Sequence, residues 1–117
     1  MMRPDADIEV LLCRTPVDFR KAINGLSNLV EQEYGLDPFA PRIFAFTNRK
    51  RDRLKLLYWD RTGFALWLKR LEKARFPWPA EGEAIVTMTG RELNWLLDRI
   101  DWFRLKPHEE LSYDSVL

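Results

Sequence analysis

The sequence predicts a single α+β domain, in which about four to five strands form an antiparallel β-meander and two amphipathic helices pack on it. Short apolar runs rich in β-forming residues recur along the chain and are separated by turn residues. Two other segments carry apolar residues three and four positions apart, each behind a helix-capping pattern. A length of 117 residues, 46% of them hydrophobic, is enough for one modest core, so we expect residues 1–117 to form one domain.

The N-terminal part predicts a strand followed by a helix. The run IEVLLCR is apolar and contains strong β-formers. Thr15 is a suitable N-cap, Pro16 fits the first helical position, and Asp18 stands where the acid of a capping box is found. A helix is therefore predicted from residue 16 onward, with Gly35 as the residue that ends it. Its apolar stripe comprises Phe19, Ala22, Ile23, Leu26, Leu29 and Val30.

The central part predicts three strands of the meander. After the proline-containing linker LDPFAP, the segment RIFAF is a strand, TNRKRD a turn, RLKLLYWD the next strand, and RTG a tight turn into FALWLKRL. Along residues 53–60 and 64–71 neither alternating face is consistently polar. This pattern predicts that both faces of the sheet are at least partly covered.

The C-terminal part predicts an extended connection, a last strand and a second helix. Prolines exclude helix from ARFPWPAEGE, and AIVTM is a short strand. Thr89 and Glu92 form a capping box, and the apolar stripe behind them predicts a helix that ends near Arg99. Residues 1–7 and 107–117 are expected to be flexible tails.

Positive charge is concentrated in the predicted meander. Between Arg49 and Arg75 there are ten Lys and Arg residues against three acids, a balance of +7, whereas the whole chain carries only +1. Such a separation of charge favours an anionic partner for one surface. We leave open whether these charges contact nucleic acid or only keep a hairpin soluble. The candidate nucleic-acid-binding residues are Arg49, Lys50, Arg51, Arg53, Lys55, Lys69, Arg70, Lys73 and Arg75, with Arg20 and Lys21 from the first helix.

Aromatic residues are interleaved with these cations, as in proteins that stack the bases of single-stranded nucleic acid on aromatic rings. The alternative, which we favour, is that the aromatic side chains belong to the core. The residues concerned are Tyr58, Trp59, Phe64, Trp67, Phe76 and Trp78.

Residues for catalysis or metal binding are sparse. The one histidine, His108, has no histidine or cysteine near it in the sequence that could serve as a second metal ligand. The glycines are scattered singly and do not form a phosphate-binding loop. Asp18, Asp60 and the pair Asp98/Asp101 are the carboxylates that a metal-dependent nuclease site would use, but each has a simpler role as a cap, turn or helix-surface residue. We therefore expect no catalytic residues, no metal and no cofactor.

The cellular setting is expected to be a reducing cytoplasm. No apolar run approaches the roughly 18 residues of a membrane span, and the acidic N-terminus does not resemble a signal peptide. Cys13 is the single cysteine and so has no partner for an internal disulfide. We expect it to be a small buried strand residue rather than a nucleophile.

Three blocks of the sequence carry a family resemblance. They are DFRKAINGLSNLV, then IFAFTNRKRDRLKLLYWDRTGFALWLKRLEKARFPWP, then VTMTGRELNWLLDRIDW. Together, over about residues 8–103, they resemble the TnpB accessory proteins encoded by the second reading frame of insertion sequence family sixty-six. The family-motif positions include Asp18, Gly25, Trp59, Asp60, Gly63, Glu72, Phe76, Trp78 and Pro79. Relatives often have glycine at the positions of Ala22 and Ala74.

The resemblance implies a non-catalytic role in DNA transposition, beside a separate transposase encoded by the same element. Two hypotheses follow. The protein either binds DNA, such as the element ends, through its basic hairpin, or it is a protein-interaction module that docks on the transposase without touching DNA. The two roles are compatible, and the oligomeric state stays open.

Overall fold

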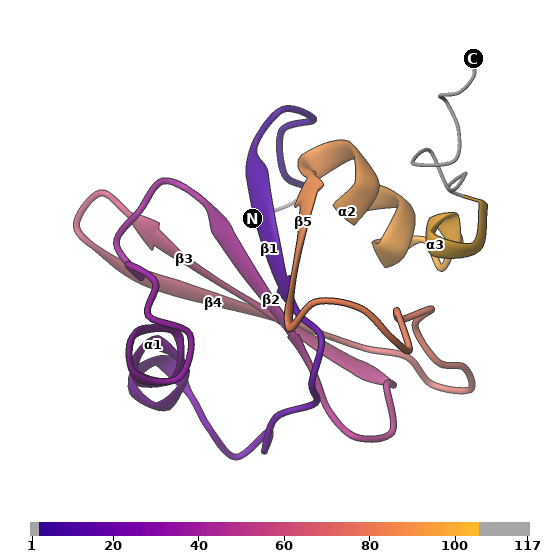
Figure 1. The fold of residues 1–117 in the computed structure, drawn as a ribbon, viewed down its shortest axis with the longest axis horizontal. Coiled ribbons are helices and arrows are strands. Elements are labelled where there is room, and N and C mark those ends of the chain that lie inside the picture. Colours follow the sequence, from indigo (N-terminus) through magenta and orange to yellow (C-terminus); the bar gives the residue numbers. More distant parts are fainter. Residues whose placement is uncertain (1–2, 106–117) are drawn as a thin grey trace.

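A computed structural model describes residues 3–105 and shows one mixed β-sheet with helices on both faces (Figure 1). The strands are β1 (Glu9–Cys13), β2 (Ile43–Thr47), β3 (Arg53–Asp60), β4 (Gly63–Arg70) and β5 (Ile85–Thr89), in the order β4-β3-β2-β1-β5. The α+β class is confirmed, as is the antiparallel meander over β2, β3 and β4.

The first strand makes the sheet mixed. β1 pairs in parallel with β2, Leu11 lying opposite Phe44, and antiparallel with β5, Leu11 lying opposite Thr87. A parallel pair needs a long crossover, which is supplied here by the segment containing α1 (Ile23–Gln32). The first strand therefore lies inside the sheet, between the meander and the last strand.

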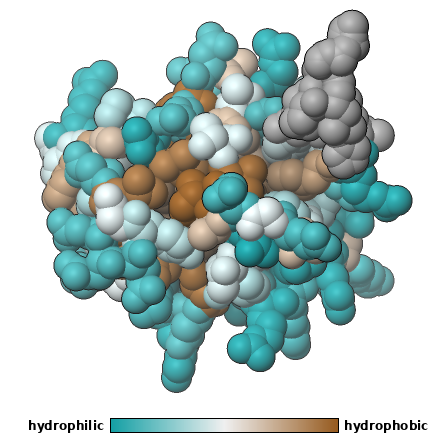
Figure 2. Space-filling model, viewed as in Figure 1, coloured by the Kyte–Doolittle hydropathy of each residue, from teal (hydrophilic) through white to brown (hydrophobic). Residues whose placement is uncertain are grey.

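Both faces of the sheet are covered, as the two-sided apolar pattern predicted. On β3, Leu54 and Leu56 belong to the core under α2 (Gly90–Leu97), together with Phe76 and Trp78 from the connection that precedes β5. Leu57 faces the other way, into the core under α1. Figure 1 shows α1 and α2 on opposite sides of the sheet, and Figure 2 shows apolar surface in the middle of this view with hydrophilic side chains around its rim.

The prediction that the first helix begins at residue 16 is wrong. α1 begins at Ile23, with Ala22 as an N-cap that makes no side-chain capping bond. Residues 15–22 instead run irregularly past the end of the sheet, because the N–H of Val17 donates to the carbonyl oxygen of Thr47 in β2 at 2.9 Å. Asp18 does not cap a helix but accepts from the N–H of Arg20 at 2.9 Å, a local bond that competes with helix formation.

The first helix ends slightly before the predicted position: α1 ends at Gln32 with Glu33 as the C-cap, so Gly35 lies two residues beyond the cap rather than directly after it. Gly35 has a φ of 63°, and the N–H of Leu36 donates to the carbonyl oxygen of Val30 at 3.1 Å. This bond joins residues six positions apart, one more than the corresponding bond of a Schellman motif, so the chain leaves the helix through a wider turn.

The second helix is confirmed in its start. Thr89 accepts from the N–H of Glu92 at 3.2 Å, and the carboxylate of Glu92 accepts from the N–H of Thr89 at 2.9 Å, so the capping box is complete. α2 ends at Leu97, Arg99 has a φ of 63°, and the short helix α3 (Trp102–Leu105) follows.

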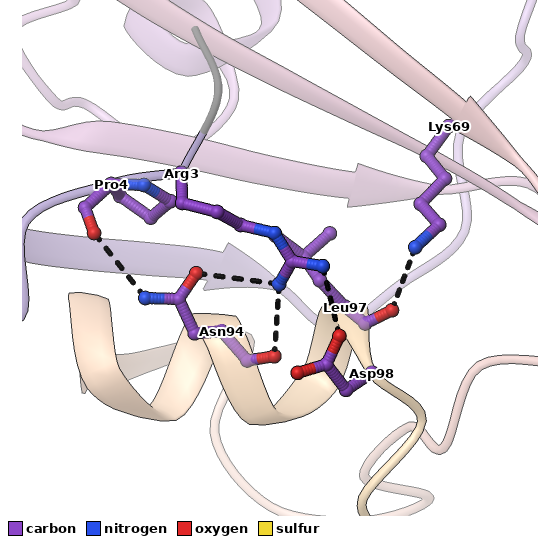
Figure 3. Close-up of polar contacts among 6 residues, drawn as sticks. All are labelled: Arg3, Pro4, Lys69, Asn94, Leu97 and Asp98. Carbon is purple, nitrogen blue, oxygen red and sulfur yellow. Dashed lines mark hydrogen bonds and ion pairs between the residues drawn. The ribbon is translucent and has the colours of Figure 1, made fainter.

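The N-terminal segment lies against α2 (Figure 3). The guanidinium of Arg3 donates to Asp98 Oδ1 at 2.8 Å, and the side-chain amide of Asn94 donates to the carbonyl oxygen of Pro4 at 3.3 Å. The flexibility expected of residues 1–7 stays a prediction, but Arg3 and Pro4 have partners on a helix. The tail predicted over residues 107–117 lies outside the described residues.

Candidate nucleic-acid interface

The turn between β2 and β3 is organised by one asparagine. The side-chain oxygen of Asn48 accepts from the N–H groups of Asp52 and Arg53, each at 3.1 Å, while its amide nitrogen donates to Asp52 Oδ1 at 2.6 Å. Arg51 has a φ of 62°, a left-handed conformation that closes the turn. The basic residues therefore belong to a short turn whose backbone is held by hydrogen bonds, rather than to a long loop.

Backbone hydrogen bonds hold two other segments against this turn. On one side, Val17 donates to Thr47, as described above. On the other side, the N–H of Leu71 donates to the carbonyl oxygen of Asp52 at 2.8 Å, and that of Phe76 donates to the carbonyl oxygen of Arg51 at 2.7 Å. Three segments that are far apart in the sequence thus meet at one end of the sheet. We call residues 15–20, 48–53 and 71–75 together the basic corner.

The turn separates two open grooves. The larger, of about 800 Å³, runs between residues 15–20 and the turn and includes Arg20, Arg49 and Arg53 in its lining. The smaller, of about 310 Å³, runs between the turn and residues 71–75 and includes Lys73 and Arg75. Lys50 and Asp52 line both grooves. The turn is therefore a ridge with cations on each flank.

Most cations of the basic corner carry no neutralising partner. Within residues 3–105, Arg49, Lys50, Arg53, Lys73 and Arg75 are exposed and form no ion pair. Hydrophilic side chains project from the lower rim of Figure 2, where the ribbon of Figure 1 places residues 15–20 and the β2–β3 turn.

One cation of the corner, Arg20, is paired, and so is Arg70, which directly precedes the corner. The guanidinium of Arg20 lies 2.7 Å from Asp18 Oδ2, and that of Arg70 lies 3.2 Å from Glu72 Oε2. The hydrogen bond from Arg20 holds the pKa of Asp18 well below its usual range, and that from Asn48 lowers the pKa of Asp52. Both carboxylates stay ionised at neutral pH, so the larger groove contains acceptors as well as cations.

Two predicted site lysines are engaged in structural bonds. The ammonium of Lys55, a buried residue, donates to the carbonyl oxygens of Phe19 at 2.9 Å and Lys21 at 2.7 Å. The ammonium of Lys69 donates to the carbonyl oxygen of Leu97 at 2.9 Å and so satisfies a terminal carbonyl of α2 (Figure 3). Neither ammonium lines the two grooves. The Lys21 side chain is exposed and packs beside Gly25. A Cβ added at Gly25 would lie 3.1 Å from the Cβ of Lys21.

The aromatic residues are not interleaved with the cations in space. Phe76 and Trp78 are core residues, as favoured above, and the indole N–H of Trp78 donates to the carbonyl oxygen of Arg14 at 2.8 Å. Trp59 and Phe64 lie 5.1 Å apart, between ring centroids, at the opposite end of the β3–β4 hairpin, where Phe39 contacts both. We call Phe39, Trp59 and Phe64 the aromatic patch.

The other family-motif positions have structural roles. Asp60 and Gly63 are the pair that closes the β3–β4 turn, and Glu72 is the partner of Arg70. Pro79 follows Trp78 in the connection to β5 and is half-buried. Asn48 and Gly90 were missed by the sequence analysis. Asn48 stands in the turn segment TNRKRD, where asparagine commonly bonds to backbone N–H groups, so its position was a usable signal.

The residues considered for catalysis or metal binding can be placed where they fall in the described part of the chain. No group of three His, Cys, Asp or Glu side chains within residues 3–105 is arranged to hold a metal ion. Asp98 is paired with Arg3, and His108 lies outside the described residues. Burial raises the pKa of Cys13 to about 12, so its thiol is protonated at neutral pH. The same range contains no helix long and apolar enough to cross a membrane.

These features define a class of protein: a small α+β domain whose mixed sheet carries a cationic corner at one end and an aromatic patch at the other. The chain belongs to the IS66 Orf2-like protein family, whose model matches residues 8–107. Members of this family are accessory proteins of insertion sequences.

Two relatives come from Sinorhizobium fredii (strain NBRC 101917 / NGR234). The chain is 35% identical to the uncharacterized protein y4jC over 106 residues, which cover 91% of each chain. It is 28% identical to the uncharacterized protein y4hO over 102 residues, 87% of this chain and 89% of the relative. No solved structure gives a significant match.

Proposed function

We propose that this protein is a non-catalytic accessory factor of transposition that binds DNA of the element through the basic corner. The observation that carries the proposal is that residues 48–53 and 71–75, held together by backbone hydrogen bonds, place five unpaired cations around one turn. In this proposal the protein acts in the bacterial cytoplasm, at the nucleoid.

Phosphate binding fits the character of these side chains. Each Lys or Arg that neutralises a phosphate releases condensed counterions, which supplies most of the affinity of sequence-independent DNA binding. Because the turn is fixed by Asn48 and by its backbone bonds to residues 71 and 76, little backbone entropy is lost when DNA binds.

The test is a salt titration of binding to a labelled duplex that carries the terminal repeat of the element. The variant Arg49→Gln/Lys50→Gln/Arg53→Gln removes three cations from the basic corner. The control Arg61→Gln/Arg91→Gln/Arg104→Gln removes three exposed cations that line neither groove. Both variants have the same net charge.

We expect the corner variant to lower affinity and to flatten the slope of log K against log salt by roughly 2 to 3, at about 0.9 per lost phosphate contact. The control should keep a slope close to that of the wild type. Equal losses of DNA affinity in the two variants would mean that the net charge alone, and not the basic corner, determines binding. Absent or salt-insensitive binding by the wild type would overturn the proposal.

The non-catalytic part of the proposal has its own test. Incubation of labelled element ends with the protein and Mg²⁺ or Mn²⁺ should leave the DNA intact. Metal-dependent cleavage that follows the protein through purification would make it a nuclease.

A second candidate function, contact with the transposase, is supported by the aromatic patch. The Phe39 ring is 53% exposed and lies 5.0 Å from Trp59, between centroids, at the far end of the sheet from the cations. Exposed aromatic clusters are frequent anchors of protein interfaces. Because the patch and the basic corner are separate, the protein can bridge DNA and the transposase.

This candidate is tested by co-purification with the transposase after nuclease treatment. Phe39→Ala should lose the transposase, whereas Trp95→Ala, which truncates another exposed aromatic residue on α2, should retain it. Trp78 is unsuitable for this test, because it is buried and bonded to Arg14. Retention of the transposase by Phe39→Ala would reject the patch as the contact.

A further inference from the structure

The β2–β3 turn stands between two grooves rather than beside one. Lys50 and Asp52 line both of them, and each groove has cations of its own. Arg49 and Arg53 belong to the larger groove, and Lys73 and Arg75 to the smaller. A single extended strand of nucleic acid would fill only one groove and leave the cations of the other without phosphates.

The basic corner also lacks a surface on which unpaired bases could stack. Phe76 is buried. Phe19 is among the residues that line the larger groove, and the Lys55 ammonium lies 4.7 Å from the centroid of its ring. The aromatic patch lies at the other end of β3, and the six residue steps from Arg53 to Trp59 span about 20 Å. Single-strand binding sites combine cations with aromatic rings in one groove, whereas here the cations of the basic corner lie away from the aromatic patch.

We propose that the ligand of the basic corner is B-form duplex DNA, with the β2–β3 turn inserted in the major groove and one phosphate backbone in each flanking groove. This inference rests on the proposed DNA binding and narrows its substrate class. The turn caps a two-stranded ribbon, an element that the roughly 12 Å wide major groove of B-DNA admits. The A-form duplex of RNA has a deep, narrow major groove that excludes it.

The polar groups on the ridge suit this position. Lys50 projects from the ridge between the two grooves, and the Asp52 carboxylate beside it is kept ionised by its bond from Asn48. Phosphate contacts from the two flanking grooves would fix the position of the turn on the duplex. The side chains of the turn itself would then contact the edges of the bases.

The experiment compares binding of four probes of equal length: the duplex terminal repeat, each of its single strands, and a duplex RNA of the same sequence. Two charge-matched variants separate the grooves. Arg49→Gln/Arg53→Gln changes the larger groove and Lys73→Gln/Arg75→Gln the smaller, with Arg91→Gln/Arg104→Gln as the control for net charge. Circular dichroism and thermal unfolding verify that each variant is folded.

We expect the wild type to prefer duplex DNA over either single strand and over duplex RNA. Each groove variant should flatten the salt slope on duplex DNA by roughly 2, and their combination by roughly 4, at about 0.9 per phosphate. Wild-type affinity in the Lys73→Gln/Arg75→Gln variant would overturn the two-groove arrangement. Equal or tighter binding to single strands or to duplex RNA would also overturn it while leaving nucleic-acid binding intact. No binding to any probe would overturn the proposed function as well.

Chemical interference gives an independent readout of the groove. Methylation of guanine N7, which lies in the major groove, should weaken binding, whereas methylation of adenine N3 in the minor groove should not. Ethylated phosphates that interfere should occur on both strands. Interference from adenine N3 alone, or from one strand alone, would contradict the proposed insertion.

Discussion

The ammonium of Lys55 lies 2.7 Å from the carbonyl oxygen of Lys21, on the segment that leads into α1. Lys55 also donates to the carbonyl oxygen of Phe19 at 2.9 Å and lies over its ring. A charged residue of a central strand therefore holds the irregular segment 15–22 against the sheet. Burial lowers the pKa of Lys55, which shows that its charge is held in a poorly solvated place.

Lys55→Met should destabilise the domain and weaken DNA binding together. The substitution keeps an apolar stem but leaves the carbonyl oxygens of Phe19 and Lys21 without their donor, at a cost of about 1 to 3 kcal/mol. Urea denaturation measures this cost. The control Lys21→Met makes the same chemical change on an exposed side chain and should leave the unfolding midpoint nearly unchanged. Equal midpoints for the two variants would contradict a clamping role for Lys55.

Asp52 should make the stability of the basic corner depend on acid. Its pKa is lowered below the ordinary value of 3.8 by the hydrogen bond from Asn48. A carboxyl group whose pKa is lower in the folded state stabilises that state above its unfolded pKa, and this contribution is lost as the pH falls through the folded pKa.

Asp52→Asn should accordingly lower the urea midpoint at pH 7, and its difference from the wild type should shrink below about pH 4. Asp7→Asn serves as the control, since Asp7 is exposed and makes no hydrogen bond within residues 3–105. A difference between Asp52→Asn and the wild type that stays constant from pH 7 to acid would contradict this assignment.

Gly90→Ala should be strongly destabilising. A Cβ at Gly90 would overlap the carbonyl oxygen of Asp5 and press on Ile8, because the N-terminal segment crosses the start of α2 there. Overpacking of this kind costs about 1 to 3 kcal/mol. Thermal unfolding measures it, and Gly63→Ala is the matched control, since a Cβ at Gly63 meets no atom within 4 Å. Equal melting temperatures for the two variants would show that the N-terminal segment can move away from Gly90 without a measurable loss of stability.

Trp78→Phe should cost about 1 kcal/mol through loss of the hydrogen bond to the carbonyl oxygen of Arg14, beyond the change in packing. Trp95→Phe removes an indole from the surface of α2 and should be close to neutral. Guanidinium denaturation followed by circular dichroism compares them. A larger loss from Trp95→Phe would reverse the order expected from burial.

Cys13 should react with thiol reagents only when the domain opens. The residue is fully buried on β1, and burial raises its pKa to about 12. At pH 8 we expect labelling by a disulfide reagent to be slow in the folded protein and to become rapid in urea, at the concentration where circular dichroism reports unfolding. Rapid labelling without urea would mean that β1 or β5 opens locally.

Hydrophobic period and turn and capping chemistry were enough to predict the β2–β3–β4 meander, the start of α2 and, to within two residues, the end of α1. They failed at residues 15–22, because the N–H of Val17 bonds to Thr47, a partner far away in the sequence. The structural roles of Lys55 and Lys69 were missed for the same reason. Their ammonium groups donate to carbonyl oxygens of segments that are distant in the sequence.

The candidate site was predicted in its charge but not in its shape. Cations of all three segments were identified from the sequence, whereas their arrangement as two grooves on either side of the β2–β3 turn became visible only in three dimensions. Cations and aromatics alternate along the sequence, yet the length of β3 carries Trp59 away from Arg53. Sequence order could not distinguish a stacking groove from two separate surfaces.

The place of β1 in the sheet has a consequence for protein synthesis. β1 leaves the ribosome first, but both of its neighbours are translated later, and β5 is the last strand of the sheet. Until Ile85–Thr89 has emerged, one edge of β1 presents unpaired N–H and C=O groups, the kind of edge through which nascent chains aggregate. A gene copy truncated before codon 85 would therefore encode an aggregation-prone fragment rather than a shortened working domain.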